Sequence, residues 1–427
     1  MQTEAEAFLQ RIRAYPDDDA PRLVFADWLD EQGDPRGAFI RVQLALAQLD
    51  REMATAGDRP LRPGREELRA NLRAREQALL DAHDTEWTAP FRRYATRPRF
   101  HRGFVEEVNV DAHNFVRHAP ELFTAGPLRH IYLLDIGGTL PSVLQSPLLS
   151  RLSALTIHAS HAGESLARAV AASEHLGGLK RLDLSRNRFE HDAALHLASS
   201  AALARLEELD LRENELGEGG ARALAASPHL SALRNLELRG NRLGPAGAEA
   251  LAASERLAAL ERLGLAENDV GSPRISSLSR IHDLLRIPIL DLSSNDLGPA
   301  GLLVILNRSS SSPPREIRLR ELDLSHNRLG DDGARILARS PHLASLRVLR
   351  LGDCEIGDEG ARALAESPYL HQLVRLDLGS NPIGDPGFRE FLSSSNLPNL
   401  RQLDYTVLRI SSEMRRDLGM RFHRGRP

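Results

Sequence analysis

The chain is poor in the residues that build disulfide-bonded and membrane-spanning proteins. Cys354 is the single cysteine among 427 residues, which excludes an intramolecular disulfide framework and favours a reducing compartment. No run approaches the roughly 18 consecutive apolar residues that a membrane-spanning helix requires. The first residues, Met-Gln-Thr-Glu-Ala-Glu, carry acids and no apolar segment, unlike a secretion signal. We therefore expect a cytoplasmic protein.

Aromatic residues and net charge are also low. Aromatics make up only 4% of the chain, so aliphatic leucine and alanine must supply the core. The 55 basic and 59 acidic residues give a net charge of 55 − 59 = −4. Such a mild charge does not favour nucleic acid or an anionic membrane as the partner.

The common signatures of catalysis are missing from the sequence. It contains no Gly-x-x-x-x-Gly-Lys phosphate loop, no Gly-x-Ser-x-Gly elbow and no His-Glu-x-x-His zinc motif. We expect no enzymatic activity, no cofactor, no metal site and no small-molecule substrate. The function is then one of binding.

What the chain does contain is a regular repeat. Asparagines recur every 27 residues from Asn187 to Asn295, and after a step of 32 residues to Asn327 the period resumes at Cys354 and Asn381. Each stands at the end of the phrase Leu-x-x-Leu-x-Leu-x-x-Asn, the signature of a leucine-rich repeat. We count twelve copies, which begin at Val105, Leu128, Leu152, Leu179, Leu206, Leu233, Leu260, Ile287, Leu319, Leu346, Leu373 and Leu400.

Each copy predicts one strand and one helix. In Leu-x-Leu the leucines point into the core and the residues between them point out. The asparagine follows at a turn, where its amide can satisfy backbone groups left unpaired. Apolar residues at helical spacing then predict a helix of about ten residues, and Ser-Pro pairs such as Ser227-Pro228 end it.

Four segments follow from these patterns. Residues 1–50 form a small helical domain around Phe8, Phe25, Trp28 and Phe39; 51–95 contain a linker and a charged helix from Glu66 to about His83; 96–408 hold the repeats; 409–427 form a C-terminal cap and basic tail. Five extra residues fall in a surface loop at Ser309–Pro314. Its serines could be phosphorylated, but a tolerated insertion is the simpler interpretation.

The strand-and-helix repeat of 27 residues resembles the ribonuclease-inhibitor and RanGAP-like subfamily of leucine-rich repeats over residues 104–408. The resemblance implies an α/β solenoid with a curved parallel β-sheet inside and α-helices outside. The stretches Asp19–Leu29 and Gly33–Arg41 resemble a small bacterial domain that accompanies repeat arrays, which implies a bacterial protein. That domain has no established activity to carry over.

The inner face of the sheet is the candidate binding surface. Twelve strands about 4.8 Å apart would extend it over roughly 50 Å. Its central row from Asp183 to Asp404 has acids at seven of nine positions. Each of the nine copies from Leu179 onward has four outward positions, which are residues 181, 183, 185 and 186 in the first of these copies. Together these positions hold twelve acids and seven arginines, a net charge of 7 − 12 = −5. The predicted partner-binding residues are Asp183, Asp210, Arg212, Glu237, Arg239, Asp291, Asp323, Arg350, Asp377 and Asp404.

Two interpretations of this acidic row stay open. In the first, the row recruits a protein with a basic surface. In the second, Leu-Asp-Leu is simply the preferred sequence of the repeat. We expect a protein-interaction scaffold. The alternatives are a regulator of a small GTPase, as RanGAP-like repeats imply, and an effector exported by a specialised system; nucleotide-dependent binding of a GTPase would distinguish the first.

Three further features have simpler interpretations. Cys354 occupies an asparagine position of the repeat, so a structural role is favoured over a nucleophilic one. The histidines between His113 and His161 lack ligand spacing, so they are expected on the surface or in caps. The basic residues from Arg415 to Arg426 could touch an acidic partner, but a cap on the last repeat is favoured.

Overall fold

The computed structural model describes residues 2–56, 64–271, 280–307, 316–406 and 410–422. Contacts divide the chain into two compact units. The first unit consists of Met1–Ser160 with Ser173–Lys180, and the second of His161–Ala172 with Arg181–Pro427. The proposed segments 1–50, 51–95, 96–408 and 409–427 do not coincide with these units, because the first unit joins the N-terminal helices to the first repeats.

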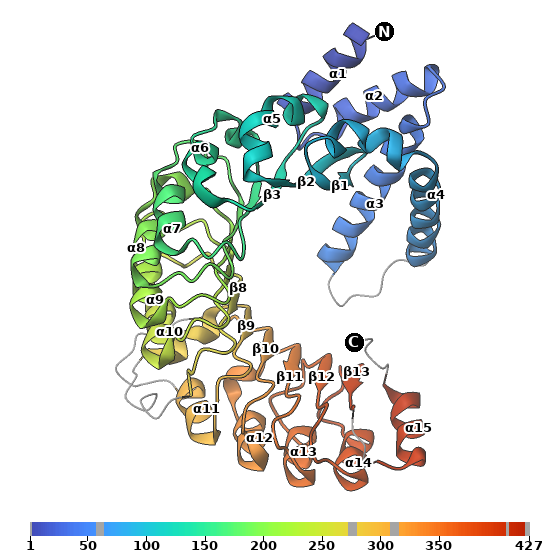
Figure 1. Ribbon diagram of the computed structural model, residues 1–427. Helices are drawn as coiled ribbons and strands as arrows, with labels where there is room; N and C mark the ends of the chain where they lie inside the picture. Colours follow the sequence, from blue (N-terminus) through green and yellow to red (C-terminus); the bar gives the residue numbers. More distant parts are fainter. Residues whose placement is uncertain (1, 57–63, 272–279, 308–315, 407–409, 423–427) are drawn as a thin grey trace. The chain divides into compact units, whose positions relative to one another are not determined.

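The first unit begins with four helices and continues with four strands (Figure 1). The helices are α1 (Gln2–Ala14), α2 (Ala20–Glu31), α3 (Arg36–Ala56) and α4 (Arg65–Arg92). After them come β1 (Thr96–His101), β2 (Phe104–Asp111), α5 (Ala112–Ala125), β3 (His130–Leu134), α6 (Leu140–Leu144) and β4 (Ala154–Thr156). Strands β2, β3 and β4 are parallel neighbours, whereas β1 pairs with β2 in antiparallel orientation.

Two predictions for this region were wrong in detail. The expected linker from residue 51 is still helix, because α3 continues to Ala56 beyond the buried Leu49; residues 57–63 lie outside the described residues. The charged helix runs on from His83 to Arg92, where Trp87 and Phe91 are buried. Strand β1 was not predicted, because its exposed, arginine-rich residues resemble no repeat.

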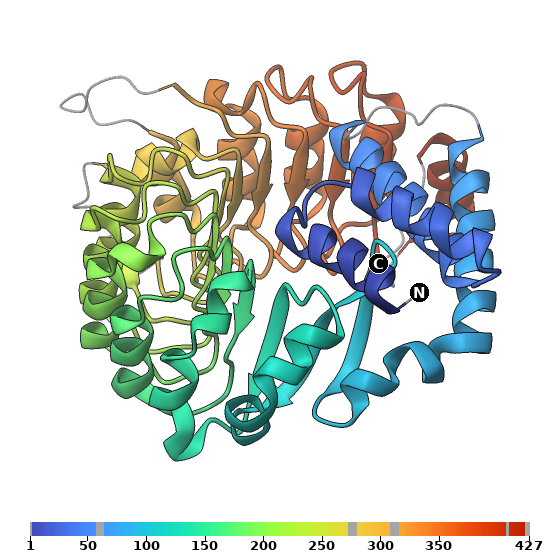
Figure 2. The same ribbon diagram turned by 90° about the horizontal axis from the view of Figure 1, so that it is seen from above.

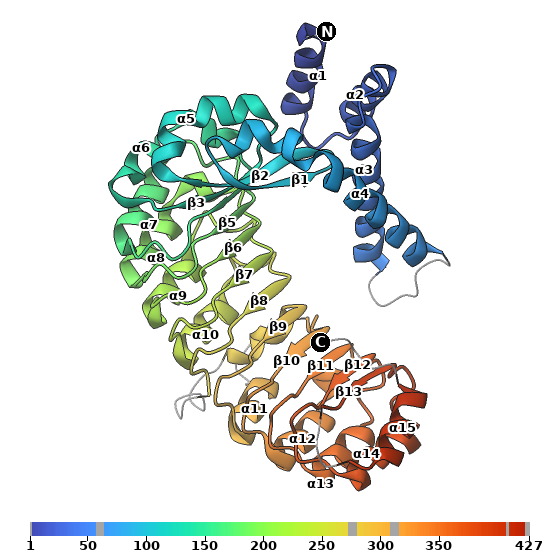
Figure 3. The same cartoon turned by 45° about the vertical axis from the view of Figure 1, so that its right-hand side comes forward.

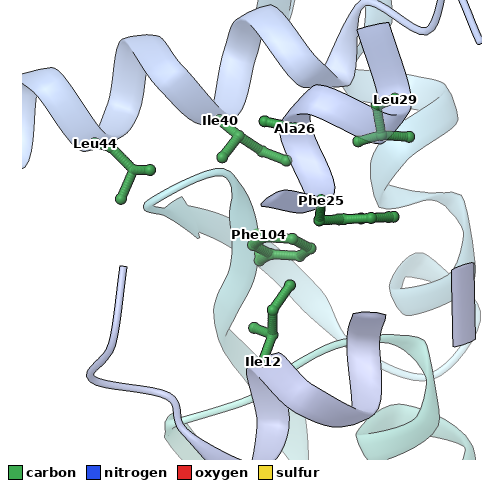
Figure 4. Close-up of a cluster of buried hydrophobic side chains, with 7 residues drawn as sticks. All are labelled: Ile12, Phe25, Ala26, Leu29, Ile40, Leu44 and Phe104. Atoms are coloured by element: carbon green, nitrogen blue, oxygen red, sulfur yellow. The ribbon is translucent and has the colours of Figure 1, made fainter. Parts of the chain in front are cut away.

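The N-terminal helices share a core with the first repeat strand. Figure 4 shows side chains from α1, α2 and α3 meeting Phe104 of β2. Beside this cluster, Nη2 of the fully buried Arg22 lies 2.7 Å from Glu106 Oε1. At the β1–β2 turn, a Cβ on Gly103 would lie 2.4 Å from Ile40 Cγ1. Glycine therefore permits the close approach of this turn to α3.

The second unit alternates strands and helices, except that the described residues between 264 and 289 contain the 3-10 helix Ile281–Arg286 in place of the predicted α-helix. Its strands are β5 (Arg181–Asp183), β6 (Glu208–Asp210), β7 (Asn235–Glu237), β8 (Arg262–Gly264), β9 (Ile289–Asp291), β10 (Glu321–Asp323), β11 (Val348–Arg350), β12 (Arg375–Asp377) and β13 (Gln402–Asp404). Its helices are α7 (Gly163–Ala172), α8 (His191–Ser199), α9 (Gly217–Ala226), α10 (Gly244–Ala253), α11 (Pro299–Leu306), α12 (Gly330–Ala338), α13 (Asp358–Ala365), α14 (Asp385–Ser393) and α15 (Ser412–Arg421). Within this unit the strands line the concave side and helices α8–α14 the outer side (Figures 2 and 3). The predicted solenoid is confirmed.

Two ladders of buried side chains join neighbouring repeats. The peptide N–H of Asn241 donates to Oδ1 of Asn268 at 2.9 Å, and Nδ2 of Asn268 donates back to Leu238 O at 2.8 Å. Equivalent bonds recur from Asn187 to Asn381. In the second ladder Ser227 Oγ donates to Ala198 O at 2.6 Å, and the same serine position repeats this bond in other copies. The predicted role of the asparagines is confirmed.

Cys354 takes part in the asparagine ladder. Its thiol is fully buried and donates to Leu324 O at 3.2 Å, while its peptide N–H donates to Asn381 Oδ1 at 3.0 Å. Burial raises the pKa of the Cys354 thiol to about 12. A thiol with such a pKa is protonated near neutral pH, which agrees with the structural role predicted for it.

Candidate functional site: the concave face of the second unit

The central row of the concave face is a single line of residues paired in register. Asp183, Asp210, Glu237, Gly264, Asp291, Asp323, Arg350, Asp377 and Asp404 each lie opposite the next on the neighbouring strand. Their charged side chains are all half-buried. Adjacent strands are about 4.8 Å apart, so acids of neighbouring copies repel one another.

Five aspartates of the row close the turn that follows their strand. Oδ1 accepts a hydrogen bond from the peptide N–H two residues later in Asp183 (2.9 Å), Asp210 (3.0 Å), Asp291 (2.9 Å), Asp323 (2.9 Å) and Asp377 (2.8 Å). This bond gives aspartate a structural reason to recur at the position. It uses one carboxylate oxygen and leaves the negative charge on the face.

Arginines balance the acids on strands β5–β8. Arg212 Nε lies 2.9 Å and 2.8 Å from the two carboxylate oxygens of Asp210, and this pairing raises the pKa of Arg212. Arg239 forms an ion pair with Glu267. The outward positions of these four copies hold six acids and five arginines, a net charge of 5 − 6 = −1.

Strands β9–β13 carry most of the negative charge, and we call this part of the face the acidic half. Its outward positions hold six acids and two arginines, a net charge of 2 − 6 = −4. Arg350 lies 3.7 Å from Glu321, and Arg375 Nε donates to Gln402 Oε1 at 2.8 Å. Both contacts are to residues outside the central row.

Arg350 stands between Asp323 and Asp377 in the central row, and small residues lie beside the aspartates of the acidic half. The row beside them contains Ser185, Arg212, Arg239 and Ala266 in the copies of β5–β8. In the acidic half all of its residues are small: Ser293, Ser325, Gly352, Gly379 and Thr406. Burial raises the pKa of Asp323, and the neighbouring charge of Asp291 raises it further. Burial and the charge of Asp404 raise the pKa of Asp377 in the same way. This concentration of charge was not predicted, although the row of small residues in the sequence could have signalled it.

The first unit has a different polar cluster on its strands, which sequence reasoning missed. Glu107 Oε2 lies 3.3 Å from His130 Nδ1 and 3.5 Å from His101 Nε2, and Arg99 forms an ion pair with the same carboxylate. Although burial opposes ionisation, hydrogen bonds from His101 and His130 hold the pKa of Glu107 well below its usual range. The signal was present, since Glu107 and His130 occupy the same outward position of the weak early repeats.

The remaining candidates give no site. Across the described residues, no group of three His, Cys, Asp or Glu side chains could hold a metal ion. Helix α15 buries Met414 and Leu418 against the end of the repeats, as expected for a cap, while the tail from residue 423 lies outside the described residues. So does the serine loop at Ser309–Ser312. No helix in the described ranges is long and apolar enough to cross a membrane.

Comparison with known proteins identifies the repeats. The family model described as "Leucine Rich repeat" matches residues 205–225, 229–252, 289–306, 319–338, 342–365 and 369–391. The chain therefore contains leucine-rich repeats. No match is found among curated proteins.

Three solved structures are similar at low identity. An internalin, InlF, from Listeria monocytogenes has 18% identity and a TM-score of 0.42, with 68% of this chain and 69% of that chain covered. The yeast Rad7 and Elc1 complex has 17% identity and a TM-score of 0.42, with 71% and 81% covered. The TLR13–ssRNA13 complex has 19% identity and a TM-score of 0.37, with 66% and 44% covered. No functional conclusion follows from these values.

Proposed function

We propose that this protein is an interaction scaffold that holds a protein partner on the concave face of its second unit. The acidic half is the main contact, and the partner presents a basic surface to it. The observation that carries this proposal is the charge of −4 on the outward positions of β9–β13, against −1 on β5–β8.

The physical argument is one of electrostatic complementarity. Aspartates in register repel one another, and burial has already cost Asp323 and Asp377 part of their hydration. A lysine or arginine placed between neighbouring carboxylates would relieve this repulsion. The small residues beside the row leave room for such a side chain. After β6 and β7 the scaffold's own Arg212 and Arg239 already take that place.

Asparagine is the informative substitution at these aspartates. It retains the oxygen that accepts the N–H of the turn and removes the charge. The test variant is Asp291→Asn/Asp323→Asn/Asp377→Asn. Its matched control is Asp332→Asn/Glu359→Gln/Glu366→Gln, which removes three charges from exposed residues on the helical side of the same unit.

Each protein is immobilised and exposed to lysate of the source cell with GTP or GDP, and retained proteins are identified by mass spectrometry. We expect a protein that is held by the wild type and the control but lost from the test variant. The affinity of the purified partner should fall about tenfold or more in that variant and should weaken with salt. Equal retention by all three proteins would refute the acidic half as the site, and GTP-dependent retention of a GTPase would favour the regulator.

A further inference from the structure

The first unit contains a cavity of about 730 Å³. It is lined by the last turns of α1, the end of α5 and the residues that lead into β3 and β4. Its volume is within the range of small-molecule sites, roughly 300–1,000 Å³. The positions of α1, α5 and β3 can be followed in Figure 1. Every lining residue belongs to the first unit, so this cavity is separate from the concave face of the second unit.

The charge of the lining is positive. Arg13, Arg129, Arg151 and Lys180 face two carboxylates, those of Glu6 and Asp17, which gives 4 − 2 = +2. Both carboxylates already have partners. Arg13 Nη1 lies 2.7 Å from Glu6 Oε1, and Arg129 Nη2 lies 3.3 Å from Asp17 Oδ1.

One of the arginines retains donors for a further anion. Arg151 has no ion pair with any described residue, and its guanidinium lies 5.9 Å from the centre of the Phe123 ring. Arg13 is already engaged, because its Nη1 pairs with Glu6 and its Nη2 donates to Thr124 O. Arg129 is held in place, because its Nε donates to Ser153 Oγ at 3.3 Å. Guanidinium groups bind carboxylate and phosphate oxygens with charge-assisted hydrogen bonds.

The other walls of the cavity mix apolar residues with the polar Gln10, Thr124, Ser150 and Ser153. Phe123, Pro127, Leu128 and Leu152 line it beside the arginines, and all four are buried. An inorganic ion alone would occupy only a small part of a cavity of about 730 Å³. We propose that the cavity binds a small organic anion that carries a carboxylate or phosphate next to an apolar group.

The proposal is tested with the full chain and defined probes. Phenyl phosphate carries a phosphate on a benzene ring, and phthalate carries two carboxylates on the same kind of ring. Benzyl alcohol is the neutral comparison. Binding is measured by ligand-observed NMR and calorimetry for the wild type, Arg129→Gln and Arg151→Gln. The control is Arg117→Gln, which removes an exposed charge from α5 outside the cavity. Circular dichroism melts of each variant verify folding, and Arg151 is exposed, so its substitution leaves the core intact.

We expect at least one anionic probe to bind and benzyl alcohol not to bind. The dissociation constant should rise about tenfold in Arg129→Gln and Arg151→Gln and stay unchanged in Arg117→Gln. Binding of phenyl phosphate alone would identify a phosphate ligand, and binding of phthalate alone a dicarboxylate. The proposal is overturned if no anion binds at about 5 mM, well above the dissociation constant of a weak site near 1 mM. Equal weakening in Arg117→Gln and Arg151→Gln would also overturn it.

Discussion

At the scale of single residues, the aspartates of the concave face combine a structural bond with a costly charge. Asp323 illustrates both, since its Oδ1 accepts the N–H of Ser325 at 2.9 Å while burial raises its pKa. Asp323→Ala removes the acceptor and should lower the free energy of unfolding by about 1 kcal/mol. Asp323→Asn keeps the acceptor and should be at least as stable as the wild type near neutral pH. Urea denaturation of the wild type and the two variants measures these free energies of unfolding. An equal loss of stability in both variants would contradict the role of the hydrogen bond.

The raised pKa values also fix the sign of the pH dependence. The pKa values of Asp323 and Asp377 are higher in the folded chain, so the folded state binds more protons between the unfolded and folded pKa values. These two residues therefore make the protein more stable as pH falls through the folded pKa values. The variant Asp323→Asn/Asp377→Asn has no carboxylates at these positions to protonate, so it does not become more stable by this mechanism as the pH falls. Its stability advantage near neutral pH should shrink on acidification, and an advantage independent of pH in urea titrations would exclude this mechanism.

At the scale of elements, one buried ion pair fixes α2 on β2. Arg22 is fully buried and contacts Glu106 at 2.7 Å. Removing one partner of such a pair leaves a charge without compensation, at a cost of about 3–5 kcal/mol, whereas replacing both by apolar residues costs much less. We expect Glu106→Gln to be clearly less stable than Arg22→Met/Glu106→Leu in chemical denaturation. A single variant as stable as the double variant would contradict this account.

The elements differ in how far the sequence could predict them. The repeat strands and helices were predictable, because the 27-residue period places each leucine and asparagine in an equivalent environment. Strand β1 was not, since its residues Thr96–His101 alternate weakly and pair only with their neighbour β2. The central acidic row could be read from the pattern as well. Its division into a balanced and an acidic half was also readable from the residue counts, whereas the pairing of individual arginines with individual carboxylates was not, because it depends on which side chains reach each other in space.

At the scale of the whole molecule, the two halves of the concave face should respond differently to equal losses of charge. Asp183→Asn/Asp210→Asn/Glu237→Gln removes three acids from the half in which Arg212 and Arg239 already form ion pairs. Asp291→Asn/Asp323→Asn/Asp377→Asn removes three from the acidic half. For a basic partner bound there, the second variant should lose more affinity and more of the salt dependence. Titrations at two salt concentrations compare them, and equal losses would point to the net charge of the chain instead.

The two side-chain ladders relate the order of synthesis to the order in which the repeats complete their hydrogen bonds. The N–H of Asn241 has its acceptor only once Asn268 exists, and Ala198 O has its donor only once Ser227 exists. A ribosome makes the chain from its N-terminus, so each newly synthesised copy completes the hydrogen bonds of the copy before it. Repeats of this kind can fold in the order in which they are made. A further copy inserted before the capping helix α15 would complete the hydrogen bonds of the copy before it in the same way.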